Sequence, residues 1–320
     1  MKKTRVCDLL GIRYPILQGG MLWLADAKLA ATVSNAGALG IISPYAKMEK
    51  HGDESKNLEE QLRRIRSLTE KPFGVNIPLD LNQSGLLIDM LLQKGVEIVI
   101  TAAGSPALYT QLLKKEGIKV LHVISSVRQG RFAASCGVDG VISEGIEAAA
   151  HNGLDELPLF SLVPQVVEAL SIPVIAAGGI VDGRGVAAAL ALGAEGVQLG
   201  TRFVAVDENP AHPKYKQAIL EAEDTDTVIT CRKLMPTRSL KTEFSRRLLE
   251  LEQSGASVEN LRDFLGYRRA RESQLDGDLD QGETFAGASA GLIKEIIPAA
   301  RVVQDLVEEY DKVIKHLAES

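Results

Sequence analysis

Residues 172–203, IPVIAAGGIVDGRGVAAALALGAEGVQLGTRF, contain two short apolar runs that each end in glycine. Gly178 and Gly179 close the first run, and Gly200 and Thr201 close the second. Several main-chain N–H groups can approach one phosphate only where no β-carbon intervenes, so strand ends of this kind suit a phosphate site. Glycine at a strand end is also ordinary turn chemistry, and the pair gains meaning from its place in the chain.

The chain up to Thr201 alternates short β-branched runs with longer amphipathic ones, which is the pattern of repeated βα units. We predict strands at residues 14–20, 39–43, 73–77, 99–103, 120–125, 140–144, 174–178 and 196–200. Helices are expected at residues 26–35, 62–68, 87–94, 108–115, 129–135, 162–170 and 185–192. The helices precede Gly37, Gly95, Gly117, Gly137 and Gly193, which suit C-terminal caps with positive φ. Eight such repeats favour a closed (β/α)8 TIM barrel over an open doubly wound sheet, and barrel enzymes often bind phosphate after the seventh and eighth strands.

The sequence changes character after residue 208. Between residues 209 and 283 the strand pattern fades and basic residues gather, at Arg232, Lys233, Arg238, Lys241, Arg246, Arg247, Arg268, Arg269 and Arg271. We expect a helical appendage here that covers the barrel mouth as a lid or substrate segment. Apolar residues at helical spacing in 296–317 predict a last helix that packs back on the barrel, so residues 1–208 and 284–320 would form the barrel.

Composition excludes several classes of protein. The 320 residues are 45% hydrophobic and can bury a large core, while a net charge of -6 argues against nucleic acid as the main partner. The three cysteines are widely spaced and lack a C-x-x-C pair, which indicates neither a disulfide framework nor zinc and favours a reducing cytoplasm. Asp8 and Arg13 interrupt the apolar stretch that a signal peptide would need at the start of the chain. No uncharged apolar run is long enough to span a bilayer.

The loop after the sixth predicted strand is the strongest candidate for catalysis, because barrel enzymes place their chemistry after the strands. Residues 144–153 bring an imidazole, His151, together with the carboxylates Glu144 and Glu147. An imidazole titrates near neutral pH, so we predict that His151 acts as an acid or base, the alternative being that it only holds the loop. His122 lies within a strand and is expected to be a buried structural histidine.

Residues after other strands suit a planar ligand. No G-x-G-x-x-G fingerprint, P-loop, H-E-x-x-H or G-x-S-x-G is present, so a Rossmann-bound dinucleotide is not expected. A mononucleotide with a planar ring over the barrel mouth fits better, and flavin mononucleotide (FMN) is the natural choice. The amides of Gln18 and Asn76 need partners at apolar strand ends, whereas Met21 and Trp23 could face a ring or belong to the core.

These loops, in this order, resemble the family that joins nitronate monooxygenases, once called 2-nitropropane dioxygenases, with the FMN-dependent enoyl-acyl-carrier-protein reductases II. The resemblance is carried by YPILQGGMLWLAD (14–26), KPFGVNIPL (71–79), EGIEAAAHNG (144–153), IPVIAAGGIVDG (172–183) and GVQLGTRF (196–203). It implies a TIM barrel that binds FMN, with NADH or NADPH as co-substrate. It places the catalytic histidine at His151 and the cofactor at Gly19, Gly20, Met21, Asn76, Ala103, Glu144, Gly178, Gly179, Gln198, Gly200 and Thr201.

One departure from the family pattern lies beside the predicted catalytic residue. The family usually has E-A-G-G-H where this chain has Glu147-Ala148-Ala149-Ala150-His151, so two methyl groups are added near the expected flavin edge. If those glycines serve positive φ or close approach, the alanines alter flavin binding or the position of His151.

The appendage is closer to the enoyl reductases than to the nitronate enzymes, through residues 235–238, GASVENLRDFLG (255–266) and GDLDQGE (277–283). The resemblance then implies NAD(P)H-dependent reduction of a trans-2-enoyl-acyl carrier protein in fatty-acid synthesis, with His151 protonating or polarising the thioester. Acyl carrier protein is acidic, and the basic residues between 232 and 247 could dock it, although solvated helix faces look similar. In the alternative, a nitronate monooxygenase, His151 takes the α-proton of a nitroalkane.

Two other hypotheses remain in view. A barrel-type purine-nucleotide oxidoreductase would need a cysteine after the sixth strand, and none follows residues 140–144. A non-catalytic flavin-binding protein would explain Ala149 and Ala150 as lost chemistry. A homodimer is a further expectation, since members of this family often pair through an apolar barrel face.

Overall fold

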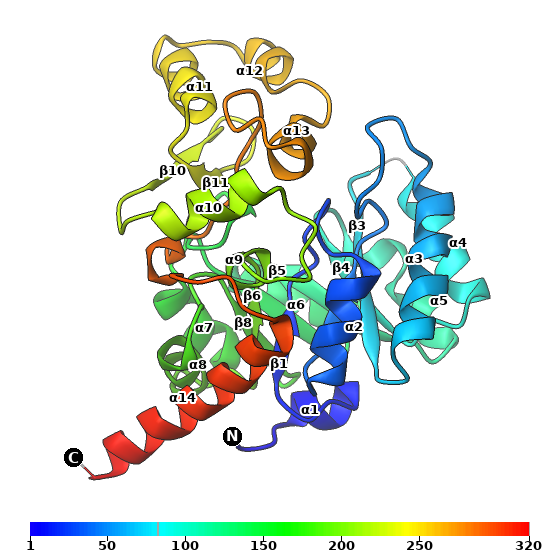
Figure 1. Ribbon diagram of the computed structural model, residues 1–320. Coiled ribbons are helices and arrows are strands. Elements are labelled where there is room, and N and C mark those ends of the chain that lie inside the picture. Colours follow the sequence, from blue (N-terminus) through cyan, green and yellow to red (C-terminus); the bar gives the residue numbers. More distant parts are fainter. Residues whose placement is uncertain (82, 320) are drawn as a thin grey trace.

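The computed structural model describes residues 1–81 and 83–319, and its centre is a ring of parallel strands (Figure 1). The strand order is β1-β9-β8-β6-β5-β4-β3-β2. A bridge between Leu17 and Leu39 joins the first strand to the last, so the sheet is a nearly closed barrel. The predicted (β/α)8 TIM barrel is therefore confirmed.

All eight barrel strands coincide with predicted ones to within two residues at either end. They are β1 (Ile16–Gln18), β2 (Gly40–Ile42), β3 (Phe73–Pro78), β4 (Ile98–Ala102), β5 (Lys119–Ile124), β6 (Gly140–Glu144), β8 (Val174–Ala177) and β9 (Gly196–Leu199). One face of each strand fills the barrel interior, where Ile41, Ile100, Leu121 and Ile142 belong to one buried cluster. The other face packs under the surrounding helices, which is why the strands are apolar on both sides.

The helices around the barrel follow the predicted rhythm. They are α2 (Ala27–Asn35), α3 (Glu54–Leu68), α4 (Ser84–Gln93), α5 (Thr110–Lys115), α6 (Val127–Ser135), α7 (Leu159–Ala169) and α8 (Gly183–Ala191). The α3 helix begins eight residues before the predicted start because Asp53 caps a polar first turn. The five glycines predicted to end helices have φ between 61° and 97°, as expected. The α14 helix (Ala299–Glu319) packs against α2 and α8, and the unpredicted α1 (Arg5–Leu10) buries Val6 and Leu10 in the barrel cluster.

The segment between residues 209 and 283 contains strands as well as helices, so the expectation of a helical appendage is wrong in this respect. It contains α10 (Pro213–Glu221), β10 (Thr227–Thr230), β11 (Thr237–Leu240), α11 (Glu243–Gln253), α12 (Val258–Leu265) and α13 (Arg269–Asp276). The β11 strand pairs with β10 and with β7 (Ala150–His151), which belongs to the loop after β6. Figure 1 shows this segment at one end of the barrel, and the β7 pairing identifies that end as the carboxyl end of the strands. None of the described helices is both long and apolar enough to cross a bilayer.

Candidate active site

Two glycine loops emerge side by side at the carboxyl end of the barrel. The β8 and β9 strands are neighbours, with Ala177 opposite Gln198, so Gly178–179 and Gly200–Thr201 leave adjacent strands. Gly178 and Gly179 have φ of 108° and 69°, and a β-carbon at Gly178 would lie only 3.0 Å from the main-chain N of Ala148. These two positions therefore require glycine for both conformation and space.

Two main-chain amides of these loops are open to a ligand. Among the described residues, no backbone hydrogen bond outside the helices and strands uses the N–H of Gly179 or Gly200. A β-carbon at Gly200 would meet nothing within 4 Å, so the space in front of this backbone is open. Unpaired donors that converge without intervening side chains fit a phosphate, and the residues present therefore fit the phosphate end of FMN.

A segment from the C-terminal part of the chain closes this site, and the sequence did not reveal it. Gly287 donates its N–H to Thr201 Oγ1 at 3.0 Å, and Ser289 Oγ donates to the carbonyl of Gly179 at 2.7 Å. The run Ala286-Gly287-Ala288-Ser289 consists of small residues, and this was the one signal that another backbone approaches closely here.

Most of the residues predicted to border the flavin ring lie close to one another. Gly19 donates its N–H to the carbonyl of Leu199 at 2.8 Å, and a β-carbon at Gly20 would clash with Asn76 at 2.4 Å. The structure thus brings Gly19, Gly20 and Asn76 together with β9, on which half-buried Gln198 lies. Half-buried Met21 joins the apolar clusters beside them.

Ala103 stays a predicted cofactor contact, whereas Gln18 and Trp23 are buried inside the protein. Ala103 is exposed after β4 with φ of 46°, and its carbonyl accepts from Leu79. The buried Gln18 amide bonds the main chain of Gly19 and Ile41, so the prediction that it meets a ligand is wrong. Trp23 is 1% exposed and belongs to the core.

The loop of residues 144–156, which we call the histidine loop, is fixed by its own contacts. The Glu147 carboxylate accepts the N–H of Leu159 at the start of α7, at 2.9 Å, so it caps a helix and does not orient His151. His151 follows in β7, exposed to solvent, with its ring centroid 5.9 Å from that of Phe285. Phe285 is a second site residue that the sequence did not indicate.

Surrounding protein atoms shift the pKa values of groups at this mouth, including that of His151, although part of the His151 side chain keeps contact with solvent. The protein atoms around His151 disfavour its charged form and lower its pKa, with a smaller opposing effect of Asp80. Burial raises the pKa of Glu144, at the end of β6, to about 7. The predicted structural histidine, His122, is 5% exposed, contacts Thr101 Oγ1 at 2.7 Å, and has a pKa lowered by burial to about 4. The site thus offers a neutral imidazole and a carboxyl that can hold its proton near neutral pH.

The two alanines that replace the family's glycines, Ala149 and Ala150, differ in backbone conformation. Ala150 has φ of 64°, whereas Ala149 has no positive φ. One of the replaced glycines therefore stands where a left-handed backbone is needed, and Ala150 adopts that conformation despite its β-carbon. The fold keeps the loop, and His151 remains next to Phe285.

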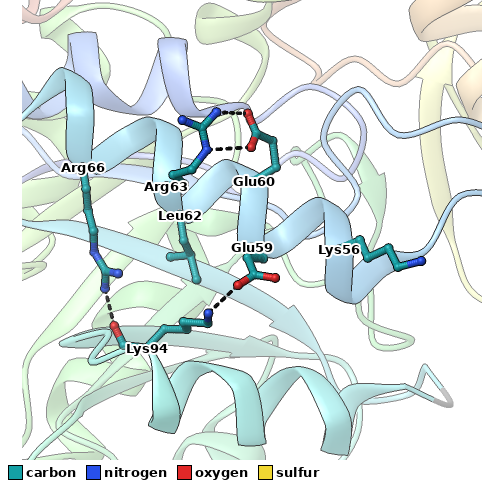
Figure 2. Close-up of a pocket in the computed structure, with 7 residues that line it drawn as sticks. All are labelled: Lys56, Glu59, Glu60, Leu62, Arg63, Arg66 and Lys94. Atoms are coloured by element: carbon teal, nitrogen blue, oxygen red, sulfur yellow. Dashed lines mark hydrogen bonds and ion pairs between the residues drawn. The ribbon is translucent and has the colours of Figure 1, made fainter.

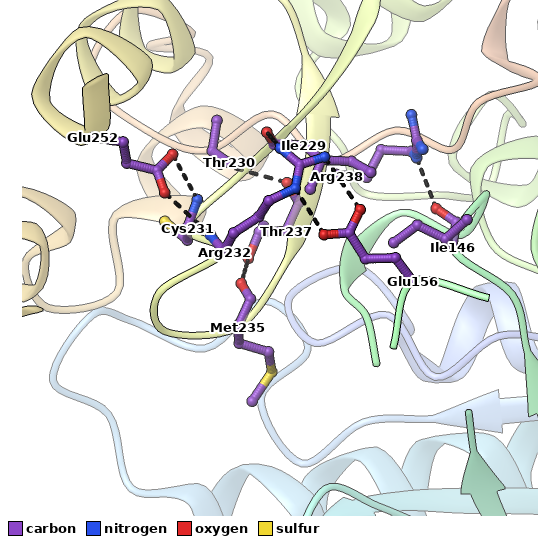
Figure 3. Close-up of polar contacts among 10 residues, drawn as sticks. All are labelled: Ile146, Glu156, Ile229, Thr230, Cys231, Arg232, Met235, Thr237, Arg238 and Glu252. Carbon is purple, nitrogen blue, oxygen red and sulfur yellow. Dashed lines mark hydrogen bonds and ion pairs between the residues drawn. The ribbon is translucent and has the colours of Figure 1, made fainter. Parts of the chain in front are cut away.

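The appendage holds the histidine loop through two arginines of the basic cluster (Figure 3). Arg238 donates to the carbonyl of Ile146 at 2.9 Å, and Arg232 forms an ion pair with Glu156 at 2.7 Å. Arg246 pairs with Glu243 and Glu250 on its own helix. Much of the predicted docking charge is therefore engaged within the chain, while Lys241 and Arg247 remain exposed.

A hollow on the outer surface does not belong to this site (Figure 2). It is lined by Lys56, Glu59, Glu60, Leu62, Arg63, Arg66 and Lys94, from α3 and the end of α4. Its charged groups pair with one another, as in Arg63 with Glu60. None of the residues that line the hollow lies at the barrel mouth, so we assign the hollow no role in catalysis.

Comparisons with known proteins agree on one family. A sequence profile of the family described as nitronate monooxygenase matches residues 3–86 and 82–309. A probable nitronate monooxygenase of Staphylococcus saprophyticus is 32% identical, over 97% of this chain and 98% of its own. A (3aS,4S,5R,7aS)-5-hydroxy-7a-methyl-1-oxo-octahydro-1H-indene-4-carboxyl-CoA dehydrogenase of Mycobacterium tuberculosis is 35% identical, over 93% of this chain and 83% of its own. The solved structure of FabK from Thermotoga maritima is 42% identical, covers 100% of this chain and 99% of that chain, and superposes with a TM-score of 0.93.

Proposed function

Because the chain belongs to the nitronate monooxygenase family, whose members are oxidoreductases, we propose that it uses FMN and NADH or NADPH to reduce a trans-2-enoyl thioester on acyl carrier protein. The observation that carries this proposal is the likeness to FabK, an enoyl-acyl-carrier-protein reductase II, along the whole chain. The relative that is a carboxyl-CoA dehydrogenase also acts on a thioester, as its name states. Reduction and dehydrogenation are the same chemistry run in opposite directions.

The residues of the mouth divide the work of such a reaction. The main chain at Gly178, Gly179, Gly200 and Thr201 would hold the phosphate of FMN, and Gly20, Met21, Asn76 and Gln198 would border its ring. FMN, when bound, supplies hydride transfer from the nicotinamide to the β-carbon of the enoyl thioester.

The lowered pKa of His151 defines how it can act. A neutral imidazole donates a hydrogen bond from its N–H, so His151 would polarise the thioester carbonyl, and a proton from solvent would complete the reduction at the α-carbon. Glu144, with its raised pKa, can donate a hydrogen bond from a protonated carboxyl to a polar group of the cofactor.

Nitronate oxidation is the second candidate. The Staphylococcus relative carries that name, and a neutral His151 could equally accept the α-proton of a nitroalkane. This reaction needs oxygen and no nicotinamide, so the two candidates differ in a measurable co-substrate.

The deciding experiment uses the purified yellow protein in two assays. NADH or NADPH oxidation is followed without oxygen in the presence of crotonyl-CoA or an enoyl-acyl carrier protein, and oxygen uptake is followed with a nitronate and no nicotinamide. Anaerobic oxidation that depends on the enoyl substrate supports the reductase, and it should fall at least about 100-fold in His151→Ala with bound flavin retained. Oxygen uptake alone would replace the reductase by the monooxygenase, and an unreactive flavin would leave the non-catalytic binder.

Docking of acyl carrier protein is proposed for the same end of the molecule. Lys241 and Arg247 are exposed there and carry charge that an acidic partner would meet. A steep rise of KM for the carrier-bound substrate with salt, absent for crotonyl-CoA, would support this contact. The homodimer stays a prediction.

A further inference from the structure

Asn152, the neighbour of His151, is bonded in an unusual way. Its side chain is 6% exposed, and its Nδ2 donates to the carbonyls of Ala148 at 3.0 Å and Ala150 at 2.9 Å. Two carbonyl acceptors fix which end of the amide carries the nitrogen. Its main-chain N–H donates to the carbonyl of Pro236 at 2.7 Å. Asn152 therefore ties the histidine loop to itself and to the appendage.

The carbonyl that Asn152 holds belongs to the residue with the strained backbone. Ala150 has φ of 64°, a region that residues with a β-carbon rarely adopt. The Ala150 carbonyl lies in the peptide plane that carries the N–H of His151, so its direction sets where the His151 side chain begins. A rotation of this peptide toward an ordinary φ would turn the imidazole away from Phe285.

We propose that Asn152 is a positioning residue whose carboxamide holds Ala150 in the left-handed conformation and thereby directs His151 at the substrate. The inference rests on the catalytic role proposed for His151. It also explains how the chain tolerates alanine at a position that requires glycine: two buried hydrogen bonds replace the conformational freedom of the missing glycine.

The test is a double-mutant cycle between Asn152→Ala and Ala150→Gly in the full chain with bound flavin. We expect Asn152→Ala to lower Tm by about 2–4 °C and kcat roughly 10- to 100-fold, with little change in KM, because the bound substrate meets a misdirected imidazole. Adding Ala150→Gly should recover most of both losses, since glycine needs no support in that conformation. Asn152→Asp keeps the size and removes the donors, and it should behave like Asn152→Ala.

Asn57 provides a matched control. Its Nδ2 also bridges two main-chain carbonyls, Pro44 at 2.7 Å and Ala46 at 3.0 Å, but after β2, on the opposite side of the barrel from β6. Asn57→Ala should lower Tm by a similar amount, leave kcat unchanged, and gain nothing specific from Ala150→Gly.

Each outcome decides the matter. An Asn152→Ala variant that loses Tm but keeps kcat would reduce Asn152 to a structural residue and overturn the proposal. A kcat loss that Ala150→Gly fails to restore would overturn the link through Ala150. The Tm values of the double-mutant cycle need no substrate, so they still measure the coupling between Asn152 and Ala150 if the reductase assay fails. In that case kcat is measured with a nitronate. Failure of the proposed function appears instead as the absence of enoyl-dependent nicotinamide oxidation without oxygen, and failure of the role of His151 appears as unchanged turnover in His151→Ala.

Discussion

Glu283 lies two residues before Phe285, the ring that packs on His151, and it is half-buried. Burial raises the pKa of its carboxyl from 4.5 to about 7. Between these values the folded protein keeps a proton that the unfolded chain has released. The free energy of unfolding contributed by Glu283 therefore falls as pH rises from about 4.5 to about 7 and stays low above that.

We expect Glu283→Gln to stabilise the protein at pH 8 by up to roughly 3 kcal/mol and to leave it unchanged at pH 4.5, because glutamine mimics the protonated acid. Urea unfolding at the two pH values measures this difference. Glu168→Gln, at an exposed position of α7, serves as the control and should be neutral at both. A Glu283→Gln variant that is no more stable than the parent protein at pH 8 would show that the carboxyl is ionised in the folded state without penalty.

Single residues of the site differ in how far the sequence reveals them. Gly178, Gly179, Gly200 and Thr201 follow two strands that local pattern predicts, so their proximity follows from parallel strand order. Phe285 could not be placed this way, because it lies in an irregular segment whose path depends on tertiary contacts. The replaced glycines predict strain in this loop, and the backbone angles place it at Ala150 and not at Ala149.

The element that couples the barrel to the appendage is the pairing of β7 with β11. Arg238 of β11 faces Ala150 across this pairing, and its guanidinium donates to Ile146 and to Thr227 Oγ1, both at 2.9 Å. Burial lowers the pKa of this guanidinium, so its place is set by hydrogen bonds to neutral acceptors as well as by charge.

We expect Arg238→Ala to lower the free energy of unfolding by about 1–3 kcal/mol, because the carbonyl of Ile146 loses its donor, and to lower kcat by loosening the histidine loop. Chemical denaturation and single-turnover kinetics measure the two effects. Arg246→Ala removes the same charge from an exposed helix and should change neither. Equal loss of kcat/KM in both variants with carrier-bound substrate would mean that Arg238 acts through docking charge instead.

Helices and strands could be predicted where the local sequence pattern determines them. The eight barrel strands alternate with amphipathic helices and are Val- and Ile-rich, so periodicity alone indicates them. The two-residue β7 exists only because β11 pairs with it, about ninety residues away in the chain. Such strands have no local hydrophobic period, which is why the 209–283 segment was expected to be helical.

At the scale of the whole molecule, barrel and appendage share one apolar cluster. Trp23 and Tyr45 of the barrel loops lie in it with Tyr215, Leu240 and Ala270 of the segment after residue 208. The boundary near residue 208 therefore marks a change in sequence pattern only, because the apolar core continues from the barrel into the appendage. We propose the division into barrel and lid as one of function, with the lid covering the mouth where His151 lies.

Arg268 attaches this lid at the side opposite the histidine loop. Its side chain is 15% exposed, pairs with Glu54, which is 7% exposed, and donates to the carbonyl of Lys50 at 2.8 Å. Its guanidinium lies 5.6 Å from the ring centroid of Trp23 and 4.7 Å from that of Tyr267. A cation that is paired, stacked and mostly buried joins the start of α13 to the loop after β2.

We expect Arg268→Met to lower the free energy of unfolding by about 3–5 kcal/mol, because Glu54 is left buried without its partner, and to expose residues 209–283 to limited proteolysis. The double variant Arg268→Met/Glu54→Leu should recover most of the stability, since apolar side chains of similar size can replace a buried pair. Arg63→Ala breaks an exposed ion pair (Figure 2) and should leave both the unfolding midpoint and the cleavage pattern unchanged. If Arg268→Met is cleaved no faster than Arg63→Ala, the lid is held by the shared apolar cluster, and the ion pair contributes little to closing the mouth.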